Sequence, residues 1–129
     1  MKTDKRTEAR ELAMQALYQL DIQGAELLNR LQDEFLNESS CDGFTRQLAY
    51  DWIKGTWDQL KMCDDLISPA IHRWQFSRLS PVDKSILRLS VYQLKCCADI
   101  PPKVVLNEAI EMAKKFSSEK SPRANALQL

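Results

Sequence analysis

The residues best placed to do chemistry recur at four-residue spacing along the first predicted helix. They are Arg6, Arg10, Met14 and Tyr18. Side chains four apart lie on neighbouring turns of a helix, so these residues form one slowly winding stripe. Guanidinium groups neutralise phosphates, and flat or polarisable side chains stack on bases. The stripe therefore favours single-stranded RNA, and we expect Met14 and Tyr18 to be partly exposed.

Neighbouring charges leave two interpretations of this stripe open. Lys2 and Lys5 add positive charge near its start, whereas Asp4, Glu8 and Glu11 reduce it. In the alternative interpretation, the arginines lay their alkyl stems over a bundle surface and Tyr18 packs its ring edge. The stripe alone does not decide between RNA binding and a structural role.

The rest of the sequence predicts neither catalysis nor metal binding. The three glycines form no phosphate-binding pattern. The one histidine, His72, has no ligand-like neighbour at helical spacing and no obvious serine or cysteine partner. The four cysteines contain no C-x-x-C pair and are interpreted as reduced structural thiols. We expect a protein that is not an enzyme and has no metal or other cofactor.

Composition and charge favour one globular domain. The 129 residues are 44% hydrophobic and 28% charged, which is typical of a folded protein with one core. Because 18 basic and 18 acidic residues cancel, any nucleic-acid surface must be a local patch. The start, MKTDKRTEAR, lacks the apolar run of a signal peptide. We therefore expect a cytoplasmic protein that does not bind membranes.

The elements that position the stripe are predicted to be helices. Apolar periodicity predicts helices at about 4–23, 25–38, 44–67 and 103–116, and no convincing strand. The expected inward residues of the last three helices are Leu27, Leu28, Leu31, Phe35, Leu48, Trp52, Ile53, Leu60, Cys63, Val105, Leu106, Ala109, Ile110, Met112, Ala113 and Phe116.

A further helix, within RLSPVDKSILRLSVYQL, is predicted to be the centre of the fold. Ser80 is a suitable N-cap and Pro81 suits the first helical position. The helix is apolar nearly all round, apart from a narrow stripe of Lys84, Arg88 and Lys95, and such a helix is buried. The prediction is an all-α, compact bundle of about six to seven helices around this buried central helix.

Three segments of the sequence together resemble the NusB family of transcription antitermination factors. They are ARELAMQALYQLD, IHRWQFSRLSPVDKSILRLSVYQL and DIPPKVVLNEAIEMAKKFSSEKSPR. With the D-x-L-I-x-P pattern that ends at Pro69, the resemblance spans most of the chain, and its motifs in this order are highly specific. It implies a single NusB-like RNA-binding domain over residues 1–129.

The resemblance implies two partners and an assembly. A family member pairs with a ribosomal protein of the NusE (S10) type and binds the boxA element of nascent RNA. The pair joins the RNA polymerase elongation complex and supports elongation on ribosomal RNA operons. Some relatives are instead homodimers that hide the RNA face, and this arrangement stays open for the present chain.

The same resemblance assigns residues to each partner. The arginine-rich motif of the family falls on KRTEAR, where Thr7 and Glu8 replace frequent basic residues, so we expect fewer phosphate contacts and a shallower salt dependence. The residues assigned to RNA are Lys2, Lys5, Arg6, Arg10, Tyr18, Lys120, Ser121 and Arg123. Those assigned to the protein partner are Tyr18, Arg78 and Asp83. Asp83 has an equally simple alternative role, because an acid in a first helical turn favours the helix dipole.

The C-terminal end departs from the family after Arg123. Relatives continue with a segment resembling F-V-N-G-V-L-D, whereas this chain has ANALQL, a shortened or diverged end for which we expect lower stability and weaker RNA binding. Two other functions stay open. One is a NusB-like domain related to those of ribosomal RNA cytosine methyltransferases, and the other is a structural dimer that does not bind RNA.

Overall fold

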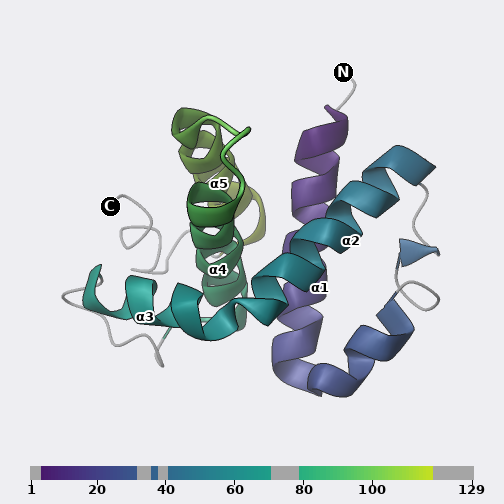
Figure 1. Cartoon of the computed structure of the whole chain (residues 1–129), viewed down its shortest axis with the longest axis horizontal. Helices are drawn as coiled ribbons and strands as arrows, with labels where there is room; N and C mark the ends of the chain where they lie inside the picture. The colour runs from purple at the N-terminus through teal and green to yellow at the C-terminus, as the bar shows by residue number, and fades with distance from the viewer. Residues whose placement is uncertain (1–3, 32–35, 38–40, 71–78, 118–129) are drawn as a thin grey trace.

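The structure, a computed structural model, describes residues 4–31, 36–37, 41–70 and 79–117. Its elements are α1 (Lys5–Gln23), the 3-10 helix η1 (Ala25–Arg30), α2 (Gly43–Asp58), α3 (Leu60–Ala70), α4 (Pro81–Cys96) and α5 (Pro102–Phe116). Figure 1 shows their arrangement. None of the residues in the described ranges lies in a strand. The predicted all-α fold is therefore confirmed.

Helix α4 lies at the centre of the fold, as predicted. It packs against α1, α2, α3 and α5. Its start follows the sequence signals, because the Ser80 Oγ accepts a hydrogen bond from the Asp83 N–H at 3.1 Å and Pro81 occupies the first turn. Ile86 and Leu89 have no exposed surface. The apolar circumference of this helix is explained by the number of helices that cover it.

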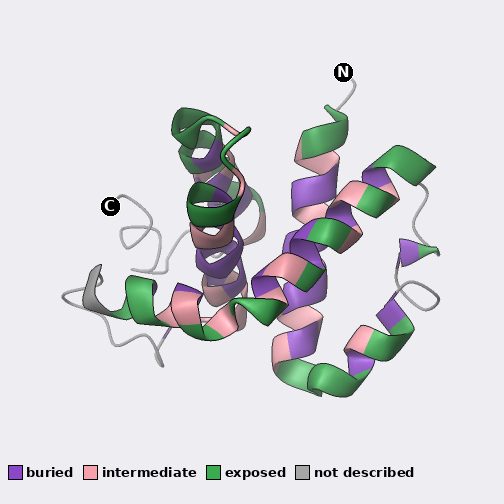
Figure 2. Cartoon of the chain, in the orientation of Figure 1, coloured by how far each residue is buried: buried purple, intermediate pink, exposed green. Residues whose placement is uncertain are grey.

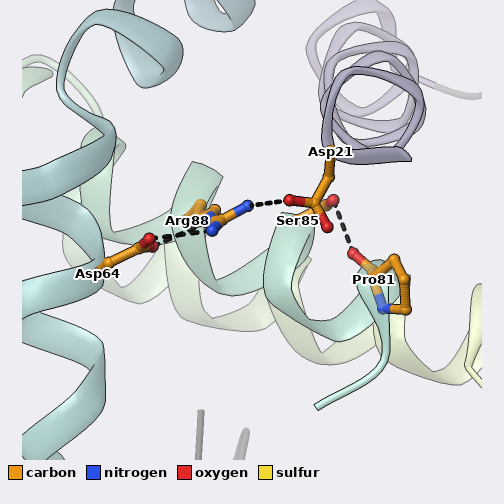
Figure 3. Close-up of polar contacts among 5 residues, drawn as sticks. All are labelled: Asp21, Asp64, Pro81, Ser85 and Arg88. Atoms are coloured by element: carbon orange, nitrogen blue, oxygen red, sulfur yellow. Dashed lines mark hydrogen bonds and ion pairs between the residues drawn. The ribbon is translucent and has the colours of Figure 1, made fainter. Parts of the chain in front are cut away.

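Arg88 corrects the predicted polar stripe of α4. Its side chain is only 8% exposed, and its Nε and Nη2 donate to the two carboxylate oxygens of Asp64 at 2.7 and 2.9 Å. Its Nη1 donates to Asp21 at 3.0 Å, so one guanidinium joins α4 to α3 and α1 (Figure 3). Burial lowers the pKa of Arg88, but the hydrogen bonds to Asp64 and Asp21 offset this effect and the net shift is upward. Two carboxylates thus make burial of this charge tolerable.

The predicted continuous helix over 44–67 is wrong at one residue. Gln59 leaves the helical conformation, with φ −107° and ψ 24°, and its N–H donates to the Gly55 and Thr56 carbonyls at 3.1 and 3.2 Å. Helix α3 then runs in a different direction from α2 (Figure 1). The apolar period continues across this break, so periodicity gave no signal of it. The change of direction brings Asp64 to Arg88.

The segment after α1 is also less regular than predicted. Residues 25–30 form a 3-10 helix where an α-helix over 25–38 was expected. Gly24 precedes it with φ 94°, a left-handed conformation that favours glycine. Leu27 and Leu31 are buried as predicted and Leu28 is half-buried, whereas Phe35 lies outside the described residues.

The core lies between α1, α2 and α4, with α5 closing one side. Buried residues follow one another along α1 and α4 in Figure 2. Met14 is 1% exposed, so the prediction that it is partly exposed is wrong; α1 is covered by both α2 and α4, and its apolar face is wider than periodicity indicated. Leu106 is 48% exposed, and the prediction that it faces inward is wrong too. Over the described ranges, every helix is too short or too polar to cross a bilayer.

Candidate nucleic-acid interface

The exposed cations of the predicted stripe lie in the first turn of α1. Asp4 caps this helix, because its Oδ1 accepts the Arg6 N–H at 2.7 Å. Lys5 and Arg6 follow directly and are both exposed. Their position in the first turn, before the buried Ala9, directs them to solvent and away from the core. Both are available to a polyanion.

Lys5 is held by the cap of a second helix. Its Nζ lies 2.7 Å from Asp42 Oδ2, while Asp42 Oδ1 accepts the Thr45 N–H at 2.8 Å and caps α2. The hydrogen bond from Lys5, with that from the Thr45 backbone, holds the pKa of the Asp42 carboxyl well below its usual range. Asp42 in turn raises the pKa of Lys5. This pair joins the starts of α1 and α2, and it partly neutralises the Lys5 charge.

Arg6 lies beside an exposed aromatic ring from α2. Its guanidinium carbon is 5.8 Å from the centroid of Phe44, whose side chain is 50% exposed. A guanidinium over a ring face is attracted by the ring quadrupole. Cation and aromatic thus stand together at the surface, which is the combination that the predicted stripe was expected to supply.

Arg10 is not part of that surface, and the prediction of an exposed stripe is wrong at this residue. It is 3% exposed. Its Nη1 donates to Glu108 Oε1 at 3.1 Å, its Nε to Gln93 Oε1 at 3.4 Å, and its guanidinium carbon lies 5.1 Å from the Trp52 centroid. Burial lowers the pKa of Arg10, and Glu108 opposes that shift. In this structure Arg10 joins α1 to α2, α4 and α5.

Glu108 also accepts a hydrogen bond from Thr7, in the first turn of α1. The Thr7 hydroxyl donates to Glu108 Oε1 at 2.5 Å. The Thr7 hydroxyl thereby ties the first turn of α1 to α5. The contact between Thr7 and Glu108 was not predicted from the sequence, because pairing between helices about 100 residues apart leaves no local pattern.

Tyr18 lies well away from Arg6. It is half-buried, and 12 residues of helix separate the two, which corresponds to about 18 Å along the axis of α1. The expected partial exposure of Tyr18 is confirmed. Its assignment to the junction between RNA and a protein partner stays a prediction.

Asp83 is fully buried at the start of α4. Its Oδ1 accepts the Ser117 hydroxyl at 2.5 Å, which joins the first turn of α4 to the end of α5. This placement favours the structural role considered for Asp83, and a contact with a protein partner stays a prediction. Five other residues assigned to partners, Lys2, Arg78, Lys120, Ser121 and Arg123, lie outside the described residues, as does the end of the chain after Arg123.

Phe44 is the surface residue that sequence reasoning missed. It was taken only as the start of a long helix, four residues before the inward Leu48. Periodicity places residues 44 and 48 on one face, so no signal marked Phe44 as exposed. No cluster of three or more histidine, cysteine, aspartate or glutamate side chains suited to a metal ion occurs among the residues that the structure describes.

Comparisons with known proteins agree on one family. A family model described as "NusB family" matches residues 7–125. The transcription antitermination protein NusB of Shewanella woodyi is 39% identical over 119 residues, which cover 92% of this chain and 87% of that protein. The NusB of Listeria innocua is 40% identical and the match covers 92% of this chain and 88% of that protein.

Solved structures show the same fold. NusB of T. maritima superposes with a TM-score of 0.74 at 32% identity, covering 99% of this chain and 90% of that one. A chain in the crystal structure of a plectonemic RNA supercoil gives a TM-score of 0.83 at 23% identity, covering 98% of this chain and 93% of that one. At that identity, the second likeness shows the fold alone.

Proposed function

The chain belongs to the NusB family of transcription antitermination proteins, and we propose that it binds boxA-type single-stranded RNA together with a NusE-type (S10) ribosomal protein. In this role it supports elongation by RNA polymerase on ribosomal RNA operons. The observation that carries the proposal is the exposed pair Lys5 and Arg6 at the start of α1. They stand where the resemblance places the RNA-binding motif of the family.

The electrostatics of this site support modest RNA affinity. Lys5 is partly neutralised by Asp42, and Arg10 is engaged inside the protein by Glu108. Each phosphate contact to single-stranded nucleic acid contributes about 0.7 to the slope of log affinity against log salt. With one or two contacts from this turn, the slope is shallow, and the protein partner supplies much of the affinity.

The test is binding of a fluorescently labelled boxA-like RNA, measured by anisotropy at several salt concentrations, with and without the NusE-type protein. Binding tightens with the partner and weakens as salt rises. Arg6→Ala weakens binding and lowers the salt slope by about 0.7. Lys61→Ala is the matched control, since Lys61 is an exposed cation on α3 that pairs only locally with Asp65. Equal affinity for boxA-like and scrambled RNA in the presence of the partner would refute the proposal.

The proposal also covers the setting of this activity. We expect a protein of the cytoplasm, where transcription takes place, without enzymatic activity of its own. Sedimentation or size-exclusion measurements with and without the NusE-type protein separate a working adaptor from a homodimer that hides the RNA face. A methyltransferase-related role predicts methyl transfer to ribosomal RNA, which a radiolabelled methyl-donor assay detects.

A further inference from the structure

Phe44 is an unusual surface residue. It is the second residue of α2, and half of its side-chain surface is exposed. The large apolar side chains that the structure describes as exposed are Ile22, Phe44, Leu66, Leu94, Val104 and Leu106. Phe44 is the aromatic one in this set. A flat ring in water offers a stacking surface that the aliphatic residues lack.

Phe44 also stands beside the cations of the proposed RNA site. Arg6 lies 5.8 Å from the ring centroid, and the Lys5–Asp42 ion pair at 2.7 Å holds the two helix starts together. The ring is thereby fixed next to a guanidinium from a different element. Alternating aromatic and cationic groups suit a nucleic-acid strand, because bases stack on the rings while the backbone follows the charges.

A surface pocket lies at the same end of α2 as this ring. It has a volume of about 170 Å³ and is lined by Leu36, Asn37, Gly43, Arg46 and Gln47. Gly43 directly precedes Phe44 in the first turn of α2, so the pocket and the ring both lie at the start of this helix. The Arg46 guanidinium is steadied by the Cys41 carbonyl, to which its Nη1 donates at 3.1 Å. Amide and guanidinium groups are the side chains that hydrogen-bond base edges in single-stranded RNA.

We propose that the RNA site extends from α1 onto α2, with one RNA base stacked on Phe44, its phosphate beside Arg6, and the edge of an adjoining base in the pocket of Asn37, Arg46 and Gln47. This inference rests on the proposed function and adds the place where bases are held. A protein partner is disfavoured as the occupant, since the pocket lining is mostly polar and the Arg6 guanidinium lies over the ring, features that suit a polyanion with flat bases.

The test compares three substitutions of Phe44 in anisotropy titrations with the boxA-like RNA. Phe44→Ala removes the stacking surface and weakens RNA binding about 5- to 150-fold, the range typical for loss of one stacked base. Phe44→Tyr keeps the ring and retains wild-type affinity. Phe44→Leu keeps apolar volume without a π face and behaves like Phe44→Ala, which separates stacking from simple burial. Leu66→Ala is the matched control, because Leu66 is 44% exposed but lies on α3.

Two further readouts identify the interaction as stacking. The salt slope is unchanged by Phe44→Ala, since no phosphate contact is lost, whereas Arg6→Ala lowers it. RNA that contains 5-bromouridine crosslinks to the peptide with Phe44 under ultraviolet light. Thermal melts confirm that each variant is folded.

The outcomes separate this inference from the proposed function. RNA binding by the wild type with Phe44→Ala within twofold of it overturns the inference alone. Loss of pairing with the NusE-type protein in Phe44→Ala, at unchanged RNA affinity, also overturns it and assigns the ring to a protein interface. Absence of specific RNA binding by the wild type with its partner overturns both proposals.

Discussion

Substitution of Arg10 tests whether this residue supports the proposed RNA site from inside the protein or contacts RNA itself. Arg10 is 3% exposed and donates to Glu108 at 3.1 Å, with Trp52 under its guanidinium. Arg10→Ala removes this charge and leaves Glu108 without its ionic partner. Loss of one partner of a buried pair costs roughly 3–5 kcal/mol, and the cation–π contact adds about 1 kcal/mol.

Glu108 is 18% exposed and keeps its hydrogen bond from Thr7, so water and Thr7 compensate part of this loss. We expect the free energy of unfolding to fall by about 3 kcal/mol, which lowers the Tm by roughly 10 °C for a domain of this size. Urea unfolding followed by far-ultraviolet circular dichroism measures the change. Arg6→Ala, on the same helix but exposed, is the control and alters the free energy of unfolding by less than about 0.5 kcal/mol.

RNA titrations below the melting transition complete the experiment. Arg10→Ala leaves the salt slope of RNA binding unchanged, because no phosphate contact is removed, whereas Arg6→Ala lowers it by about 0.7. The reasoning is refuted by an Arg10→Ala variant of wild-type stability with a reduced salt slope. That result would mean that Arg10 leaves Glu108 and contacts phosphate when RNA binds.

Three other predictions concern the core. Arg88→Met should lower the free energy of unfolding by about 3 kcal/mol in urea titrations, since Asp64 and Asp21 lose their shared cation. Unchanged stability would contradict this role, and Lys95→Met, at an exposed lysine of the same helix, is the control. Burial raises the pKa of the Cys63 thiol from 9.0 to about 11, so the thiol stays protonated to higher pH in the folded state than in the unfolded state. The free energy of unfolding should therefore decline between these two pH values, and Cys63→Ser should flatten this decline in melting curves measured at alkaline pH. Gly55→Ala places a Cβ against the Tyr92 ring and hydroxyl and should cost about 1–3 kcal/mol of unfolding free energy, with Tyr92→Ala in the same chain recovering part of it.

The helices and their apolar faces were largely predictable, because periodicity and capping are local. Ser80 and Pro81 marked the start of α4, and the apolar circumference of that helix predicted its central place. The break at Gln59 was not predictable in this way, since the apolar residues keep their spacing through it. Its conformation is set by how α3 packs on α4, which is tertiary information.

Some residues of the candidate site were likewise predictable from the sequence, and others were not. Lys5 and Arg6, which the resemblance assigned to RNA, are exposed in the structure, as charged residues of a first turn commonly are. The burial of Arg10 was not predicted, because four-residue spacing placed it beside Arg6, while its partners Glu108 and Trp52 come from distant helices. Arg88 was misjudged for the same reason, since Asp21 and Asp64 are its neighbours only in the folded chain. A sequence pattern predicts that a charged side chain faces water, unless the pattern also contains its ionic partner.

The bonds that Glu108 makes to α1 have a consequence for the order of folding. They join residues 98 and 101 positions apart in the chain, so they close some of the longest loops in the molecule. Contacts of such separation carry a large loop-closure entropy and are expected to form after the local helices. Since synthesis proceeds from the N-terminus, the ribosome makes α1 first and α5 much later. The first turn of α1 is therefore tied to α5 only when the last described helix has docked, whereas the Lys5–Asp42 pair can join it to α2 earlier. A nascent or partly folded chain would carry the basic residues of this turn without the anchor that Glu108 provides.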